Sequence, residues 1–189
     1  MKPSQEVLWQ SFVGRLTTRI QRRDSYTLDY VTRFHEELGS PGNKLNIVHV
    51  GGTNAKGTIT YKLARMFELS GYKTGFFQSP HLFSWRERVQ VDNQLVPKEY
   101  CIEFLEKYKH VRDKIGVDLS YFEFFTLLGY DYFAHSGVDV AVVEVGLGGK
   151  LDATNILRKS LLSILTSVDL DHTHVLGNTR EEIASMSVV

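Results

Sequence analysis

A ten-residue stretch, "HVGGTNAKGT" at residues 49–58, has residue types that can hold a phosphate group. It lies between an apolar run and a helix-like pattern, so backbone N–H groups and the positive end of a helix would point to one place. Lys56 would add a charge for phosphate oxygens, and Thr58 a hydroxyl near a bound magnesium ion. The stretch departs from the strict phosphate-loop pattern, because Ala55 precedes the lysine and Gly57 follows it. From the pattern alone, a nucleotide-binding loop and an ordinary tight turn are equally good interpretations.

Three further polar stretches also follow strand-like apolar runs: "QSPHL" at 78–82, "EVGLGGKLDATN" at 144–155 and "VDLDHTH" at 168–174. They carry carboxylates, imidazoles, hydroxyls and a glycine-rich backbone, which can bind a cation or approach a ligand closely. In open sheets of parallel strands, ligands bind at the edge where the strands end. Four such strand endings therefore indicate one site.

Strand and helix patterns alternate along the chain, and these elements would position the four polar stretches at the ends of the strands. Strands are expected at 45–50, 73–79, 138–146 and 161–169, a hairpin at 88–96 that turns at Asp92-Asn93, and helices at 25–38, 58–71, 97–115 and 120–137. The two near-continuous aliphatic runs, 138–146 and 161–169, are typical of parallel strands covered on both faces. In the helix at 58–71, one face is expected to carry Ile59, Leu63, Met66 and Phe67. We expect a doubly wound, mostly parallel α/β sheet.

The composition bounds the class of protein. A length of 189 residues suits one domain, and 22 basic against 22 acidic residues give no sign of a nucleic-acid partner. The single cysteine, Cys101, excludes an internal disulfide, and no apolar run is long enough for a membrane span. The basic N-terminal segment fits an amphipathic helix, with Val7, Leu8, Phe12, Leu16 and Ile20 on one face, better than a mitochondrial presequence. We expect a cytoplasmic protein, with the mitochondrion as the alternative.

The phosphate-loop stretch resembles the "GTNGKGS" loop of the folylpolyglutamate synthase and dihydrofolate synthase family, part of the larger Mur-ligase group. Four other segments are similar to family signatures and occur in the family's order: "SPHLFSWRERVQV", "SYFEFFTL", "VEVGLGGKLDATN" and "SVDLDHTHVLGNTREEIA". Together they cover roughly residues 45 to 186. The resemblance implies an ATP- and Mg²⁺-dependent ligase that adds L-glutamate to folate or dihydropteroate through an acyl phosphate, with no nucleic-acid or membrane partner.

The resemblance also implies roles for particular residues. Lys56, Glu144 and His172 would be the catalytic residues. Nucleotide would bind to Gly52, Thr53, Asn54, Ala55, Lys56, Gly57 and Thr58; the metal to Ser79, Glu144 and His172; and the pteridine-bearing substrate to Ser120, Tyr121, Phe122, Glu123, Asp152 and Asn155.

Each assignment has a structural alternative. Glu144 could be a salt-bridged or capping glutamate, His172 a structural histidine, and Ser79 a turn cap. The aromatic residues at 121–125 could begin a buried helix, and Asp152 could form a turn. Arg86 and Arg88 could meet an anionic substrate or pair with Glu87.

The chain departs from the family pattern in three places: at Ala55, at Lys150, where the family usually has arginine, and at Asp169. Family members are also longer, so we expect residues 1–189 to be an N-terminal Mur-ligase-like ATP-binding domain that lacks its C-terminal part and the C-terminal ligase domain. The alternative function is a non-catalytic nucleotide-binding remnant or splice product of such a ligase.

Overall fold

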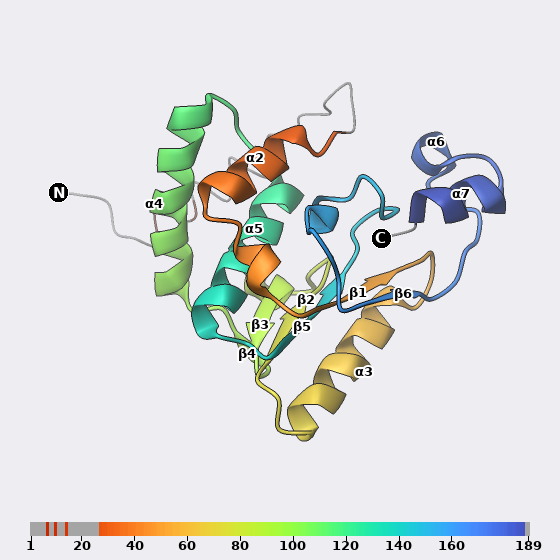
Figure 1. Ribbon diagram of the computed structural model, residues 1–189, viewed down its shortest axis with the longest axis horizontal. Helices are drawn as coiled ribbons and strands as arrows, with labels where there is room; N and C mark the ends of the chain where they lie inside the picture. The colour runs from red at the N-terminus through yellow and green to blue at the C-terminus, as the bar shows by residue number, and fades with distance from the viewer. Residues whose placement is uncertain (1–6, 8–9, 11–13, 15–26, 188–189) are drawn as a thin grey trace.

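The computed structural model describes residues 7, 10, 14 and 27–187, which build a six-stranded mixed sheet with helices on both faces (Figure 1). The strands are β1 (Ile47–Gly51), β2 (Thr74–Phe77), β3 (Val89–Val91), β4 (Gln94–Leu95), β5 (Val140–Glu144) and β6 (Leu162–Leu165). Their order across the sheet is β4-β3-β2-β5-β1-β6. The pairs β2–β5, β5–β1 and β1–β6 are parallel, whereas β3 and β4 are antiparallel additions. The predicted mostly parallel α/β sheet is confirmed.

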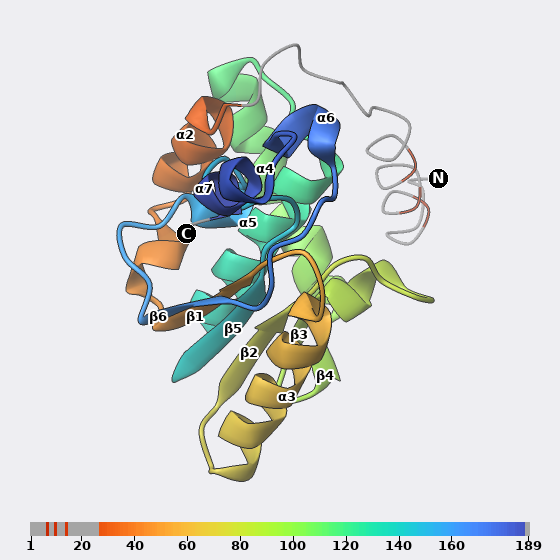
Figure 2. The same ribbon diagram turned by 90° about the vertical axis from the view of Figure 1, so that its right-hand side faces the viewer.

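The helices divide between the two faces of the sheet. They are α2 (Asp29–Glu37), α3 (Lys56–Leu69), α4 (Lys98–Ile115), α5 (Tyr121–Ser136), α6 (Thr173–Leu176) and α7 (Arg180–Ser187), with short 3₁₀ turns η1 (Pro41–Lys44), η2 (Trp85–Arg88) and η3 (Ala153–Asn155). Helix α3 packs on β5 and β2, while α5 packs on the opposite face with α2 and α4 outside it (Figures 1 and 2). Helices α6 and α7 lie together beyond the ends of β1 and β6. No helix among the described residues combines the length and apolar character that a membrane crossing requires.

The central strand β5 is buried at all five positions, as its aliphatic sequence predicts. The prediction that the 161–169 run is covered on both faces is wrong. Strand β6 lies at the edge of the sheet, beyond the part that α3 covers, so Leu162 and Leu165 remain 52% and 45% exposed. Met66, expected on the buried face of α3, is also exposed at 62%. An aliphatic run indicates a strand, but it does not say whether a helix covers it.

Local sequence signals account for several junctions. The β3–β4 hairpin turns at Asp92 and Asn93, both with positive φ, which these residue types tolerate better than most. Helix α5 begins with a capping box: the Ser120 hydroxyl accepts from the Glu123 N–H, and the Glu123 carboxylate accepts from the Ser120 N–H. Helix α4 ends at Gly116, whose left-handed φ of 77° suits glycine.

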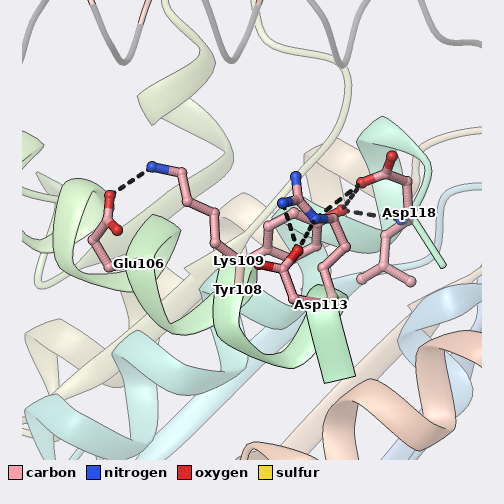
Figure 3. A network of polar contacts seen from close by, with 7 residues as sticks. Glu106, Tyr108, Lys109, Asp113 and Asp118 are labelled. Atoms are coloured by element: carbon pink, nitrogen blue, oxygen red, sulfur yellow. Dashed lines mark hydrogen bonds and ion pairs between the residues drawn. The ribbon is translucent and has the colours of Figure 1, made fainter. Parts of the chain in front are cut away.

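The segment after α4 is fixed by a polar network (Figure 3). The Tyr108 hydroxyl donates to Asp118 Oδ1 and accepts from the Leu119 N–H, both at 3.1 Å. Arg112 pairs with the neighbouring Asp113 at 2.6 Å. The two Tyr108 contacts anchor the short connection that leads into α5, and the N-terminus of α5 carries the predicted substrate residues. The expected N-terminal helix around Val7 lies almost entirely outside the described residues.

Candidate functional site

The phosphate-loop stretch forms a tight connection between β1 and α3. β1 ends at Gly51 and α3 begins at Lys56, with the residues between them in a bend. Gly52 has a φ of 126°, and a Cβ there would lie 2.3 Å from Thr166 Oγ1, so only glycine fits. Ala55 has a φ of 65°, in the left-handed region where the family pattern has glycine. The strand–loop–helix turn is therefore formed, and the left-handed conformation of Ala55 costs about 1 kcal/mol relative to glycine.

The residues that follow β6 hold this loop in place. The Thr53 N–H donates to the Ser167 carbonyl at 2.7 Å, and the Asn54 N–H donates to the Ser167 hydroxyl at 3.1 Å. The Thr166 hydroxyl donates to the Asn54 carbonyl at 2.6 Å. The N–H groups of residues 56–58 begin a helix, where backbone donors have no acceptor within the helix. Those donors are the ones suited to an anion.

Lys56 folds back over the loop. Its Nζ donates to the Gly52 carbonyl at 2.7 Å and to the Thr53 carbonyl at 3.4 Å. The same side chain borders a hollow, which we call the loop hollow. Its lining residues are Gly52, Thr53, Lys56, Gly146, Leu147, Gly148, Asp171, His172, Leu176 and Ser187. Three of the four polar stretches identified in the sequence thus meet around one space.

Glu144, at the end of β5, is 5% exposed. One carboxylate oxygen, Oε2, accepts the Ser79 N–H at 3.0 Å, and Oε1 has no hydrogen-bond partner among the described residues. Burial raises the pKa of Glu144, and the Ser79 N–H, Lys56 and Arg88 act in the opposite direction. A Cβ on Gly57 would lie 3.3 Å from Oε1, so the carboxylate faces the first turn of α3. A buried, half-satisfied carboxylate beside a phosphate loop fits a hard divalent cation.

The other two predicted metal residues lie at the same edge of the sheet. Ser79 contacts Glu144 through its backbone N–H, and His172 borders the loop hollow. His172 has a left-handed φ of 47°, is about half exposed and lies 3.7 Å from Asp171 Oδ2. Across the described part of the chain, no three His, Cys, Asp or Glu side chains gather as a metal cluster. The shared metal site therefore stays a prediction.

The predicted substrate residues on α5 have internal partners in this structure. Ser120 and Glu123 bond to each other in the capping box. Phe122 packs edge-on against Phe77. A Cβ on Gly146 would lie only 2.5 Å from Cζ of the Phe122 ring, so the ring needs a glycine at this position. Phe122 is therefore wedged between the sheet and the glycine-rich loop while remaining half-buried.

Tyr121 lies under a buried arginine. The Arg88 guanidinium is centred 5.0 Å from the Tyr121 ring, and its Nε donates to His81 Nδ1 at 2.9 Å. Arg88 is 8% exposed, and burial lowers its pKa. The alternative that Arg86 or Arg88 forms an exposed ion pair with Glu87 is wrong for the described structure. Arg86 Nε donates to the Val96 carbonyl, and the Glu87 carboxylate accepts the N–H groups of residues 82–84.

Asp152 and Asn155 hold the glycine-rich loop. Asp152 is 5% exposed; its Oδ2 accepts the Leu147 N–H at 2.9 Å and its Oδ1 accepts the Thr154 N–H at 3.0 Å. Burial raises the pKa of Asp152, and these donors oppose the rise. Asn155 Nδ2 donates to the Lys150 carbonyl at 3.4 Å. The turn-forming interpretation of Asp152 is thus seen directly, and substrate contact stays a prediction.

Asp169, unexplained from sequence, has a partner in α7. Its Oδ1 accepts from Arg180 Nη2 at 2.9 Å, and its pKa is lowered by the Leu170 N–H and by Arg180. Its backbone N–H also donates to the Thr53 hydroxyl at 3.0 Å, which ties it to the phosphate loop. His49 and Thr154 are buried, and His49 Nε2 lies 2.7 Å from Thr154 Oγ1. The sequence gives one sign of this pair, a polar residue, His49, within an apolar strand.

Comparison with known proteins places these features in a family, although no protein-family model matches the chain. The chain is 40% identical over 148 residues to the mitochondrial folylpolyglutamate synthase of Bos taurus, covering 75% of this chain and 25% of that protein. It is 40% identical over 156 residues to the dihydrofolate synthase/folylpolyglutamate synthase of Haemophilus influenzae, covering 79% and 35%. The structure of E. coli FolC in complex with DHPP and ADP matches with a TM-score of 0.87 at 35% identity, covering 94% of this chain and 42% of that one.

The chain thus spans between a quarter and about two fifths of the length of these relatives. Sequence similarity and structural similarity both extend over most of the chain. The resemblance inferred from those motifs is confirmed. The chain belongs to the folylpolyglutamate synthase/dihydrofolate synthase family.

Proposed function

We propose that the chain binds ATP with Mg²⁺ and is the nucleotide-binding part of a ligase that adds L-glutamate to folate or dihydropteroate. The observation that carries the proposal is the buried, half-paired Glu144 carboxylate facing the first turn of α3 beside Lys56. The names of the curated relatives and the ADP bound to E. coli FolC support it.

The loop residues would act mainly through charge and alignment. Lys56 would move from its carbonyl partners to the β- and γ-phosphate oxygens, and the free N–H groups at the start of α3 would bind the same oxygens. Glu144, His172 and Ser79 would hold Mg²⁺, which supplies neutralising charge to the phosphate oxygens when bound. Thr58, in the first turn of α3, would offer a hydroxyl beside it.

The reaction we propose has two balanced steps. A carboxylate oxygen of the pteroate or folate attacks the γ-phosphorus, the bond to the β–γ bridging oxygen breaks, and ADP leaves. The glutamate amine then attacks the acyl carbon, an amide bond forms, inorganic phosphate leaves, and the amine gives up a proton. For these steps the protein must align the reactants and stabilise the developing charge, and it needs no covalent nucleophile.

We further propose that residues 1–189 correspond to an N-terminal Mur-ligase-like ATP-binding domain and that Ser120, Tyr121, Phe122, Glu123, Asp152 and Asn155 face the pteridine-bearing substrate. Support comes from Phe122 and Asp152, which contact Gly146 and Leu147 of the glycine-rich loop. We propose the cytoplasm as the compartment, with the mitochondrion, named for the bovine relative, as the alternative.

The test is a glutamate-dependent assay with purified protein, ATP, Mg²⁺ and either folate or dihydropteroate. The ligase proposal expects ADP release that requires both acceptor and glutamate, together with a product one glutamyl unit heavier by mass spectrometry. Nucleotide binding without any glutamate-dependent ADP would instead favour the non-catalytic nucleotide-binding remnant. Absence of nucleotide binding would contradict both functions.

A further inference from the structure

Three buried polar side chains form a continuous hydrogen-bonded path between β1 and the glycine-rich loop. His49, Thr154 and Asp152 are 1%, 0% and 5% exposed. His49 Nε2 lies 2.7 Å from Thr154 Oγ1, and that hydroxyl donates to Asp152 Oδ1. The other Asp152 oxygen accepts the Leu147 N–H at 2.9 Å. The path begins in β1 and ends in the glycine-rich loop.

The direction of these hydrogen bonds follows from the number of protons available. A threonine hydroxyl has one hydrogen, and Thr154 gives it to Asp152. The Thr154 oxygen therefore accepts from His49, which places a proton on His49 Nε2. Burial lowers the pKa of His49 to about 4, so the ring is neutral at physiological pH.

Asp152 depends on this arrangement because it is buried and no described residue forms an ion pair with it. Within the described part of the chain, its donors come from its own loop: the Thr154 hydroxyl and nearby backbone N–H groups. If the Thr154 hydroxyl turned away, Asp152 would lose a donor, and an unbalanced buried carboxylate binds its remaining partners less well. The affected partner is Leu147, a lining residue of the loop hollow.

The opposite wall of the hollow is the direct continuation of the strand that carries His49. β1 carries His49 and ends at Gly51, and the next two residues, Gly52 and Thr53, line the hollow with Lys56. The buried path therefore connects β1, the strand that leads into the phosphate loop, to Leu147 on the glycine-rich side of the loop hollow. The hydrogen bond between His49 and Thr154, which are 105 residues apart in the sequence, connects the two ends of this path.

We propose that His49 is a positioning residue for nucleotide binding, acting through Thr154 and Asp152 to fix the Leu147 backbone and the glycine-rich wall of the loop hollow. The effect on affinity rests on the proposed function, since it requires that nucleotide enter this hollow. The effect on the loop itself does not.

The test compares His49→Leu, which removes the donor, with His49→Gln, whose amide N–H has a similar reach to Nε2–H. Two quantities are measured: hydrogen exchange of the Leu147 amide without ligand, and affinity for a non-hydrolysable ATP analogue. His49→Leu should speed Leu147 exchange by about tenfold and weaken binding by roughly three- to tenfold, as the loss of one buried hydrogen bond allows. His49→Gln should restore both.

Tyr130→Phe is the matched control. The Tyr130 hydroxyl donates to the Thr154 carbonyl at 2.6 Å, so its loss affects the same residue but not the path to Asp152. This variant should leave Leu147 exchange and affinity unchanged even where it lowers the melting temperature. Thr154→Val removes the donor to Asp152 itself, so it should speed Leu147 exchange at least as much as His49→Leu, and adding His49→Leu to it should cause no further loss.

The outcomes separate the two proposals. Unchanged Leu147 exchange in both His49→Leu and Thr154→Val, or an equal change in Tyr130→Phe, overturns the positioning role. If Leu147 exchange becomes faster while nucleotide affinity stays unchanged, the proposal that His49 supports nucleotide binding is also overturned. If the wild type binds no nucleotide, the proposed function fails, while Leu147 exchange still decides whether the path holds the loop. If His49→Leu does not fold, Thr154→Val and His49→Gln provide the comparison.

Discussion

The carboxylate of Glu144 accepts a 3.0 Å hydrogen bond from the backbone N–H of Ser79, and this bond joins the ends of two neighbouring parallel strands, β5 and β2. The bond orients one oxygen of Glu144 and leaves the other facing Gly57 at the start of α3. The side chain is therefore held in place while keeping an oxygen available. That arrangement suits a cation ligand better than a fully paired structural glutamate.

Replacing Glu144 with glutamine should remove the metal dependence of nucleotide binding and preserve the fold. Glutamine keeps the size and can still accept the Ser79 N–H, but it lacks the charge that attracts Mg²⁺. Because burial already raises the pKa of this carboxyl, removing the charge should not lower the melting temperature. Affinity for an ATP analogue, measured across a Mg²⁺ series, should be flat in the variant and rise with Mg²⁺ in the wild type. Unfolding of the variant would favour a structural role.

Lys56→Ala should weaken ATP binding by a few kcal/mol at most, the range of a charge-assisted hydrogen bond. Lys56 already lies over the loop through its bond to the Gly52 carbonyl. Lys62→Ala is the matched control, since Lys62 is an exposed lysine of the same helix. Calorimetric titration should show the loss in the first variant alone. Equal affinities of Lys56→Ala and wild type for ATP would contradict the assignment of Lys56 as a phosphate contact.

Ala55→Gly should tighten nucleotide binding, by no more than roughly tenfold. The positive φ of Ala55 costs alanine about 1 kcal/mol, which favours other loop conformations in the free protein. Glycine removes that cost and should raise the population of the loop that can bind. Ala55→Val should do the reverse, because a β-branched residue tolerates this conformation poorly. Titration of the three forms with one ATP analogue should rank glycine first and valine last; the opposite ranking would refute the role of strain.

The stability of the protein should fall below pH 6.5, in part because of His49. Above that pH the His49 ring is neutral in both the folded and the unfolded protein. Between pH 6.5 and about 4 the ring is protonated in the unfolded chain but stays neutral in the folded protein. The loss from this group should reach about 3 kcal/mol by pH 4. Urea unfolding of wild type and His49→Gln across this range measures it, since the variant lacks the titrating ring. Parallel curves for the two proteins would contradict the buried neutral histidine.

Local patterns in the sequence were enough to predict much of the scaffold. The turn at Asp92-Asn93, the capping box at Ser120 and Glu123, and the strand–loop–helix unit around Lys56 each depend on residues close together in the chain. Their physics is short-ranged, so residue type and spacing specify them.

The remainder depends on contacts between distant segments. No local pattern shows that Asp169 pairs with Arg180, or that Ser167 braces the phosphate loop 113 residues earlier in the chain. The same limit explains the exposure of β6, which results from its place at the edge of the sheet. His49 reads as one polar residue in an apolar strand until the fold brings Thr154 to it.

The most direct test of the central claim is a calorimetric titration of the wild-type chain with a non-hydrolysable ATP analogue, with and without Mg²⁺. We expect saturable binding at one site, tighter with Mg²⁺, because Glu144 offers an oriented carboxylate oxygen beside the phosphate loop. Wild-type protein that is folded by circular dichroism and yet shows no binding at analogue concentrations on the order of 1 mM, corresponding to less than about 4 kcal/mol, would contradict it.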